Sequence, residues 1–153
     1  LRDARAAIEE VNIAGLALAR LVIETLPDTD VLALYRSVAD LQEAVGVIRA
    51  FAPLPRRVST TVPTTGYDDV RRVALARLAI PNVPSIQVDW ALYGPKLAQV
   101  ALTMGADDLD GVSASDAAPE GRRRAPLEEV RRNITAAALE PVERNGRSEL
   151  HSA

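Results

Sequence analysis

The stretch "SIQVDWALYGPKLAQVALTMGADDLDG", residues 85–111, contains the unit that decides the fold. Its first residues, 85–90, form an apolar run of the length of a strand. Pro95 stands where proline is favoured at the start of a helix, and Gly105 stands where a helix commonly ends. Residues 106–112 then predict a second short strand. A strand, a helix and a second strand in this order indicate two parallel strands joined by a crossover helix.

The same alternation extends over the rest of the chain. A first helix is predicted at 2–14, and the last predicted helix follows Pro126 after a loop at 113–125. Between these helices, hydrophobic periodicity and turn residues predict the following segments: a strand at Leu16–Glu24, a helix with an apolar stripe from Val31 to Val45, a strand at 47–53, a loop at 54–66 and a helix at 67–80. The chain therefore reads as one helix followed by about four strand–helix units, an α/β protein with parallel strands.

Two architectures satisfy this pattern. A complete (β/α)8 barrel needs eight strand–helix units and about 250 residues, and this chain has 153 residues and half that number of units. It is either a small open doubly wound sheet or the C-terminal half of a barrel. The periodicity of the residues leaves both open.

The composition excludes several classes of protein. Hydrophobic residues make up 48 % of the chain, which is typical of a globular domain, and a net charge of −3 argues against nucleic acid as a partner. The apolar run Leu16–Ile23 is interrupted by Arg20 and is too short to cross a membrane. Because there is no secretory signal, we expect a cytoplasmic protein. Because Leu1 lies within a helical pattern and no initiator methionine precedes it, we expect a fragment of a longer protein.

Metal sites have few ligands to draw on. The chain has no cysteine, which excludes disulfides and thiolate ligands from these 153 residues. Its one histidine, His151, belongs to the C-terminal tail. We therefore expect no metal site within this chain.

Polar side chains occur on strands that should be buried on both faces. They occupy these positions: Arg20 and Glu24 on the first strand, Arg49 on the second, Gln87 and Asp89 on the third, and Asp107, Asp108 and Asp110 on the fourth. Such a series indicates a polar lumen or a ligand site near the carboxyl ends of the strands. The alternative is structural, with Arg49 and Asp89 forming an internal ion pair.

Three further features have both a structural and a functional interpretation. The aspartates of "GADDLDG" either bind loop amides at a corner, or Asp108 or Asp110 faces a ligand. Trp90 either packs under the loops or stacks on a ring of the ligand. Thr64 and Thr65 precede a helix and are placed to cap it. No residue shows the partner that would make it an assignable catalytic acid or base.

The segment "IPNVPSIQVDWALYGPKLAQVALTMGADDLDG" (80–111) resembles the C-terminal part of radical S-adenosylmethionine enzymes of the futalosine menaquinone pathway. That group includes aminofutalosine synthase, dehypoxanthine futalosine cyclase and the deazaflavin-cofactor synthase. "LQEAVGVIRAFAPL" (41–54), "TTG" (64–66) and "LEPVERNGRSEL" (139–150) also fit the group. The resemblance therefore covers about 41–150.

The resemblance implies a fold and an activity. It implies a (β/α)8 barrel, of which residues 1–153 are the C-terminal part of a single domain that needs its N-terminal half. It also implies S-adenosylmethionine and a [4Fe–4S] cluster as cofactors, and an aminofutalosine synthase-like reaction in which a 5′-deoxyadenosyl radical adds to an enolpyruvyl benzoate. The cluster motif of the family is absent, so we expect this chain to be inactive alone. A cyclase-like sibling and a non-catalytic half-barrel that binds a small molecule are the alternatives.

One departure from the family affects the first strand. Glu24, in "LVIETLPD", stands where the family often has a histidine. The residues that we expect to contact cofactor or substrate are the following: Glu24, Arg49, Gln87, Asp89, Trp90, Asp108 and Asp110.

Overall fold

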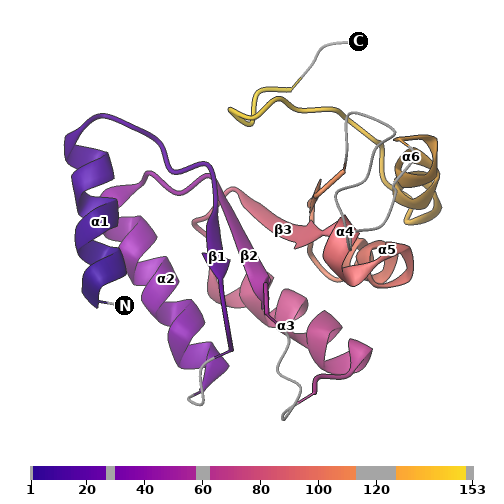
Figure 1. Ribbon diagram of the computed structural model, residues 1–153, viewed down its shortest axis with the longest axis horizontal. Coiled ribbons are helices and arrows are strands. Elements are labelled where there is room, and N and C mark those ends of the chain that lie inside the picture. Colours follow the sequence, from indigo (N-terminus) through magenta and orange to yellow (C-terminus); the bar gives the residue numbers. More distant parts are fainter. Residues whose placement is uncertain (1, 27–29, 58–62, 113–126, 151–153) are drawn as a thin grey trace.

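The computed structural model describes residues 2–26, 30–57, 63–112 and 127–150. The predicted loop at 113–125 and Pro126 lie outside these ranges. The elements in chain order are α1 (Arg2–Ile13), β1 (Leu21–Ile23), α2 (Val31–Val45), β2 (Ala50–Pro55), α3 (Gly66–Ala79), β3 (Ser85–Asp89), α4 (Trp90–Tyr93), α5 (Pro95–Thr103), β4 (Asp108–Asp110) and α6 (Leu127–Ala136). Figure 1 shows them coloured along the chain.

The four strands form one parallel sheet in the order β1-β2-β3-β4. A doubly wound sheet reverses its strand order at a switch point, whereas a (β/α)8 barrel adds each new strand next to the previous one. The order observed here is that of a barrel. The predicted α/β class with parallel strands is confirmed, and the sheet matches half of a barrel.

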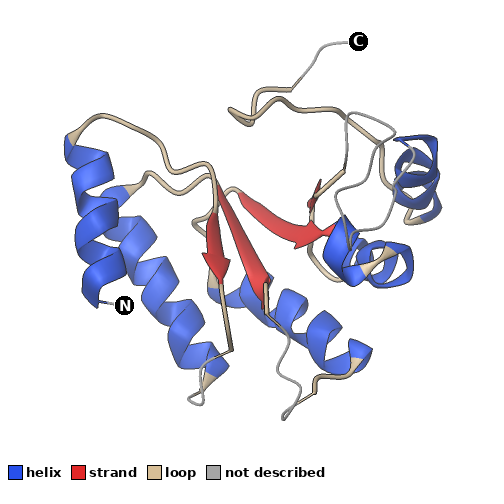
Figure 2. Ribbon diagram, viewed as in Figure 1, coloured by secondary structure: helices blue, strands red, loops and turns tan. Residues whose placement is uncertain are grey.

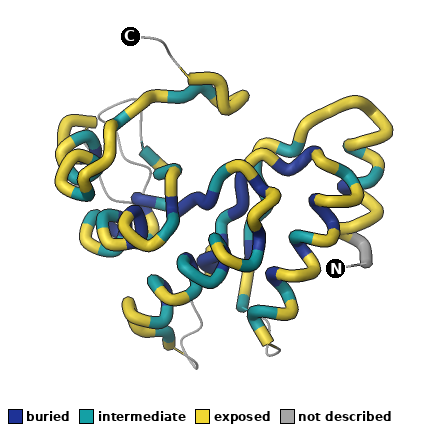
Figure 3. Tube along the Cα trace, turned by 180° about the vertical axis from the view of Figure 1, so that it is seen from behind, coloured by how far each residue is buried: buried dark blue, intermediate teal, exposed yellow. Residues whose placement is uncertain are grey.

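The helices follow one another around the sheet in the same order as the strands. α1 packs on α2, α2 on α3, α3 on α5 and α5 on α6, and Figure 2 shows this row of helices outside the four strands. Alternate strand residues point toward the helices, among them Phe51, Ile86 and Val88, each at most 1 % exposed. The ring of Tyr35 from α2 meets Phe51 edge-on, with ring centroids 5.6 Å apart. This helix-facing side of the sheet is the hydrophobic core, and Figure 3 shows the buried residues gathered along it.

Capping residues determine where two helices begin. Asp30 accepts a hydrogen bond from the backbone N–H of Leu32 (2.9 Å) at the start of α2. Thr65 and Asp68 form a reciprocal capping box at the start of α3. The predicted capping role of the threonine pair is therefore confirmed for Thr65.

The predicted bounds of β1, β2 and β4 were wrong. β4 covers Asp108–Asp110 and is two residues shorter at each end than the predicted strand at 106–112. β1 covers only Leu21–Ile23, with Leu18 making an isolated bridge to Ile48. β2 begins later than predicted and continues through Pro55, where the prediction had begun a loop. Prolines in β2 have no N–H to donate to a neighbouring strand. Next to them, between Val22 and Ile23, the register of β1 on β2 shifts. Pro53 and Pro55 are fully buried, and just beyond them the backbone N–H groups of Arg56 and Arg57 donate to the carbonyls of Ile23 and Glu24.

Candidate functional site

The three aspartates in and just before β4 have different partners. Asp107 accepts hydrogen bonds from the Ser85 hydroxyl (2.8 Å) and from the backbone N–H of Ile86 (2.9 Å). Its other oxygen accepts from Arg77 of α3 (Nη2 to Oδ2, 2.6 Å), and Arg77 also donates to the carbonyl of Gly105 (2.7 Å). Asp107 therefore joins α3, β3 and β4 at the corner between α5 and β4, which is a structural role.

Asp108 faces the opposite side of the sheet, the inner face, and lies at the amino end of β4. Its carboxylate accepts two hydrogen bonds from Arg144, from Nε to Oδ2 (2.7 Å) and from Nη2 to Oδ1 (3.0 Å). The side-chain amide of Gln87 on β3 also donates to it (3.1 Å). The side chain of Asp108 is 13 % exposed, so these donors replace most of its water.

Asp110 forms an ion pair with Arg20, which precedes β1. The same guanidinium lies 3.3 Å from the side-chain oxygen of Gln87 (Nη1 to Oε1). Between β1 and β3, β2 contributes the small side chain of Ala52 to the lining of the inner face. A continuous polar chain thus runs across the inner face from Arg144 through Asp108, Gln87 and Arg20 to Asp110.

Burial and the surrounding charges act on Arg20. Burial lowers the pKa of its guanidinium, as do the positive charges of Arg56 and Arg144, and the charges of Asp89 and Asp108 oppose the shift. Arginine nevertheless stays protonated in proteins. Arg20 is therefore a permanent cation within a partly desolvated site.

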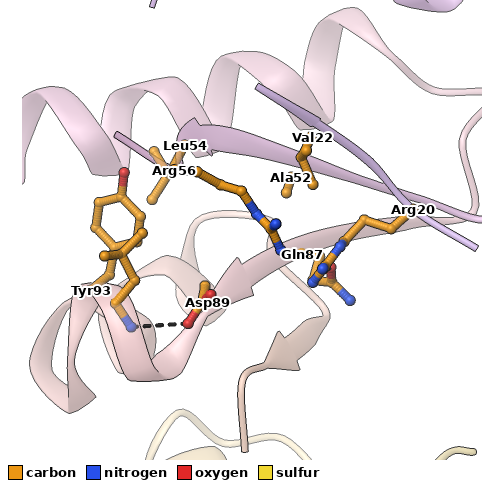
Figure 4. Close-up of a pocket in the computed structure, with 9 residues that line it drawn as sticks. Arg20, Val22, Ala52, Leu54, Arg56, Gln87, Asp89 and Tyr93 are labelled. Carbon is orange, nitrogen blue, oxygen red and sulfur yellow. Dashed lines mark hydrogen bonds between the residues drawn. The ribbon is translucent and has the colours of Figure 1, made fainter. Parts of the chain in front are cut away.

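A pocket lies on the inner face toward the carboxyl ends of the strands, next to this chain of residues (Figure 4). Its lining residues come from β1 to β3, α4 and the segments beside them: Arg20, Val22, Ala52, Leu54, Arg56, Gln87, Asp89, Leu92 and Tyr93. The lining combines apolar side chains from β1, β2 and α4 with charged and polar ones. This is the position at which α/β barrels bind their ligands.

Asp89 takes part in the local structure of this pocket. It ends β3 and accepts a hydrogen bond from the backbone N–H of Leu92 (2.9 Å), which caps α4. Gly111, with a φ of +74°, lies against it, and a Cβ at that position would stand 2.5 Å from Oδ1 of Asp89. The close approach of β4 to Asp89 therefore requires glycine.

The hydroxyls of Tyr93, which lines the pocket, and of Tyr35 bind the carboxyl end of β2. The hydroxyls of Tyr93 and Tyr35 donate to the carbonyls of Pro55 (2.5 Å) and Pro53 (3.3 Å), and burial raises the pKa of both phenols. They remain neutral donors. Each bond gives a partner to one proline carbonyl near the carboxyl end of β2.

Asp69 of α3 lies buried close to the same groups. It pairs with Arg72, whose Nη1 is 3.1 Å from Oδ1. Burial raises the pKa of the Asp69 carboxyl, while hydrogen bonding from Thr64 and the charge of Arg72 oppose the rise.

Of the seven predicted site residues, the structure brings four together. Gln87, Asp89, Asp108 and Asp110 all lie on the inner face, as alternation along β3 and β4 predicts.

The other three lie elsewhere. Trp90 is 1 % exposed within the hydrophobic core, so it packs there. Glu24 is exposed and pairs with Arg57 at the surface (Nε to Oε1, 2.8 Å). Arg49 is exposed and precedes the start of β2. It lies two residues before Phe51, which faces the helices, so alternation does not place Arg49 on the inner face.

Sequence reasoning missed three residues of this face, Arg56, Tyr93 and Arg144, and it noted Arg20 as a polar strand residue without predicting that Arg20 contacts a ligand. Arg20 could have been included, because a partly buried arginine beside a strand requires a partner or a ligand. Arg144 carried no such signal, since it lies 36 residues from Asp108 along the chain.

Known proteins share this region of sequence. The profile of the CofH/MqnC C-terminal region matches residues 51–153. Aminodeoxyfutalosine synthase of Thermus thermophilus is 35 % identical over 122 residues, covering 69 % of this chain and 32 % of that protein. The 5-amino-6-(D-ribitylamino)uracil–L-tyrosine 4-hydroxyphenyl transferase of Archaeoglobus fulgidus is 34 % identical over 118 residues, covering 69 % and 34 %. Cyclic dehypoxanthine futalosine synthase of Streptomyces coelicolor is 32 % identical over 82 residues, covering 50 % and 21 %.

The chain therefore belongs to the CofH/MqnC family and corresponds to the C-terminal region of the family's proteins. It spans about a third of the length of the first two of these relatives. Within the described residues, no set of three or more histidine, cysteine or acidic side chains is arranged to hold a metal ion. None of the described helices combines the length and the apolar character needed to cross a membrane.

Proposed function

We propose that this chain forms the C-terminal half of a (β/α)8 barrel in a radical S-adenosylmethionine enzyme of the futalosine route to menaquinone, similar to aminofutalosine synthase. One observation carries the proposal. The chain belongs to the CofH/MqnC family, its sheet has the strand order of a barrel, and the face of the sheet opposite the helices carries polar side chains. The whole of 1–153 then belongs to a single barrel domain. The partner that completes it is the N-terminal half, which would cover the edges of β1 and β4.

The cofactors of the family fit this chain unequally. A [4Fe–4S] cluster is held by cysteine thiolates, and the chain has no cysteine. Its residues do not fit the cluster, and we assign them no step that involves it. Carboxylate, amide and guanidinium groups on the inner face do fit the polar parts of S-adenosylmethionine and of a substrate.

The proposed role of this chain is to bind and orient. Asp110 and Arg20 would orient the ligand at the carboxyl ends of the strands, while Asp108, Gln87 and Arg144 hold them in place from the amino end. When bound in the complete enzyme, S-adenosylmethionine would supply a 5′-deoxyadenosyl radical, after one-electron reduction by a cluster held outside this chain and with loss of methionine, for addition to an enolpyruvyl benzoate. The inner face would contribute by fixing the distance and orientation of the two reactants.

Two alternatives are supported by particular observations. The similarity to cyclic dehypoxanthine futalosine synthase favours a cyclase-like sibling. The pocket on the inner face is the observation behind the other alternative, a non-catalytic half-barrel that binds a small molecule.

The test is an assay of the complete protein that contains this chain, reconstituted anaerobically with iron and sulfide. S-adenosylmethionine is supplied either with the enolpyruvyl benzoate or with dehypoxanthine futalosine, and products are identified by mass spectrometry. Addition of the adenosyl group to the benzoate substrate supports the proposal, and a cyclised product instead supports the sibling. Ligand binding without turnover of either substrate would favour the binding module and overturn the proposed activity.

A further inference from the structure

The segment that follows α6 ends in a turn held by its own hydrogen bonds. Residues 139–150 of this segment are called the C-terminal strap below. The side-chain oxygen of Asn145 accepts from the backbone N–H groups of Arg147 (2.9 Å) and Glu149 (3.1 Å). The backbone N–H of Asn145 donates to the carbonyl of Glu149 (3.0 Å), and an antiparallel bridge joins the two arms of the turn. The strap therefore ends in a defined conformation.

Two neighbouring residues attach the strap to different layers of the fold. Glu143 accepts a hydrogen bond from Arg131 of α6 (Nη2 to Oε1, 2.5 Å), in the helix layer. Arg144 binds Asp108 on the inner face, with N–O distances of 2.7 and 3.0 Å. Asp108 is the first residue of β4. The strap therefore joins the helix layer to the inner face at the amino end of β4, where Figure 1 shows the segment returning to the sheet.

The strap also exposes apolar side chains. Leu139, Val142 and Leu150 are 43 %, 51 % and 71 % exposed, and Figure 3 shows the segment as largely exposed. A single exposed apolar residue is ordinary on a protein surface. Three of them on one short segment, which ion pairs hold in place, indicate a surface that another part of the protein covers.

The strand order indicates which part that is. Within the described residues, β4 is an edge strand that pairs only with β3. In a closed barrel the next strand along this edge is the first strand of the N-terminal half. Because all the strands are parallel, that strand would begin near Asp108, where the strap is attached. Two relatives are about three times as long as the region that this chain matches, so a protein of that length has enough sequence for this half.

The helix layer offers a reference for comparison. Leu78 on α3 is 79 % exposed, as apolar as the strap residues and at least as accessible. The helices of a (β/α)8 barrel form its outer ring. Completing the barrel would therefore leave Leu78 exposed and would cover the strap.

We propose that the C-terminal strap is a docking surface for the N-terminal half of the barrel. Leu139, Val142 and Leu150 pack against the amino ends of its strands, and the strap closes the amino end of the inner face. Ligands then reach the inner face only from the carboxyl ends of the strands. The inference deepens the proposed function, on which it rests for the presence of the N-terminal half.

The experiment measures how fast introduced thiols react with a maleimide in the complete protein, without S-adenosylmethionine or substrate. Val142→Cys and Leu150→Cys report on the strap, and Leu78→Cys is the matched control because it replaces an equally accessible apolar residue. Peptide mass spectrometry follows each site separately. The same reaction in urea gives the rate of the uncovered thiol, and thermal unfolding establishes that each variant is folded.

We expect the two strap thiols to react roughly tenfold more slowly than Leu78→Cys in the folded protein, and at the same rate as Leu78→Cys in urea. Adding Arg144→Met to Val142→Cys should speed its reaction, because the strap is then released from Asp108, and Arg144→Lys should restore part of the protection. Equal rates for the strap thiols and Leu78→Cys in the folded protein would overturn the proposal. Protection that is lost on dilution would also overturn it, because a second copy would then be the cover.

A photoactivated cross-linker attached to the thiol of Val142→Cys identifies what covers the strap. Cross-links to the N-terminal half of the same molecule support the proposal. Cross-links confined to residues 1–153, or to a second molecule, would contradict it.

Thiol protection and turnover report on separate claims. If the strap is protected but no radical product forms, the proposed function fails and the docking surface stands. If product forms while Val142→Cys reacts as fast as Leu78→Cys, the docking surface is wrong and the proposed function stands.

Discussion

Arg144 and Asp108, 36 residues apart in the chain, form a two-pronged ion pair across the amino end of the inner face, with N–O distances of 2.7 and 3.0 Å. The segment after α6 runs back toward the end of the sheet where the strands begin (Figure 1). The pair attaches this segment to β4. The pair also fixes the Asp108 carboxylate. That carboxylate accepts a hydrogen bond from the side-chain amide of Gln87, whose oxygen in turn accepts from Arg20.

Arg144→Met should lower the free energy of unfolding by about 1–3 kcal/mol, because it leaves a largely buried carboxylate without its main donors. Urea denaturation of the complete protein measures the change. Arg131→Met is the matched control, since Arg131 pairs with Glu128 and Glu143 at an exposed site and should matter less. Equal losses in the two variants would show that the Arg144 pair is only a surface contact.

Asp107→Asn and Asp110→Asn should separate structure from function. Asp107→Asn removes the charge that meets Arg77, so stability should fall by about 1 kcal/mol with turnover little changed. Asp110→Asn leaves Arg20 without its carboxylate, and turnover of the complete enzyme should fall by one to two orders of magnitude, about 1–3 kcal/mol. If both variants keep full activity and only stability changes, the aspartates of "GADDLDG" form a corner and nothing more.

Gly111→Ala should destabilise the protein more than Gly46→Ala. Both glycines have positive φ, +74° and +65°, so both variants incur backbone strain of about 1 kcal/mol. Only at Gly111 would the new Cβ also collide with Asp89, which caps α4, and we expect a total of about 2–4 kcal/mol there. Thermal unfolding of the two variants measures the difference, and equal shifts in Tm would mean that β4 does not approach Asp89 this closely.

Asp68 and Asp69 should give pH dependences of opposite sign. Burial raises the pKa of Asp69, so its contribution to stability is present below about 3.8, the unfolded value, and is lost as the pH rises through the raised folded value. Hydrogen bonds from Thr65 lower the pKa of Asp68, so its contribution is present above about 3.8 and is lost as the pH falls through the lowered folded value.

Unfolding free energies of Asp68→Asn, Asp69→Asn and the unmodified protein between about pH 3 and 6 provide the comparison. The advantage of the unmodified protein over Asp68→Asn should grow with rising pH, and its advantage over Asp69→Asn should shrink. Parallel trends in the two comparisons would mean that Asp69 is not desolvated.

Alternation along β3 and β4 was enough to predict half of the candidate site. Gln87, Asp89, Asp108 and Asp110 have the parity that places them inward, and apolar residues between them require burial on the helix side. The same rule could not place Arg49, because β2 begins one residue after it. A register error of one residue moves a side chain to the other face.

Contacts between distant segments could not be read from periodicity. Whether Trp90 packs or stacks depends on α4, a four-residue helix that turns it into the core. The pairing of Arg20 with Asp110 and of Arg144 with Asp108 requires the strand order to be known. That order also decides between the open sheet and the half barrel, and hydrophobic patterns do not specify it.

Light scattering of this 153-residue chain tests the half-barrel account most directly, first alone and then with the N-terminal half of its barrel. In the half barrel that we propose, the edges of β1 and β4 and the inner face would lack the cover that the N-terminal half provides. We predict that the chain alone self-associates as its concentration rises, and that the added half converts it into a one-to-one complex. A chain that stays a monodisperse monomer over a wide concentration range, with no affinity for the N-terminal half, would contradict the account.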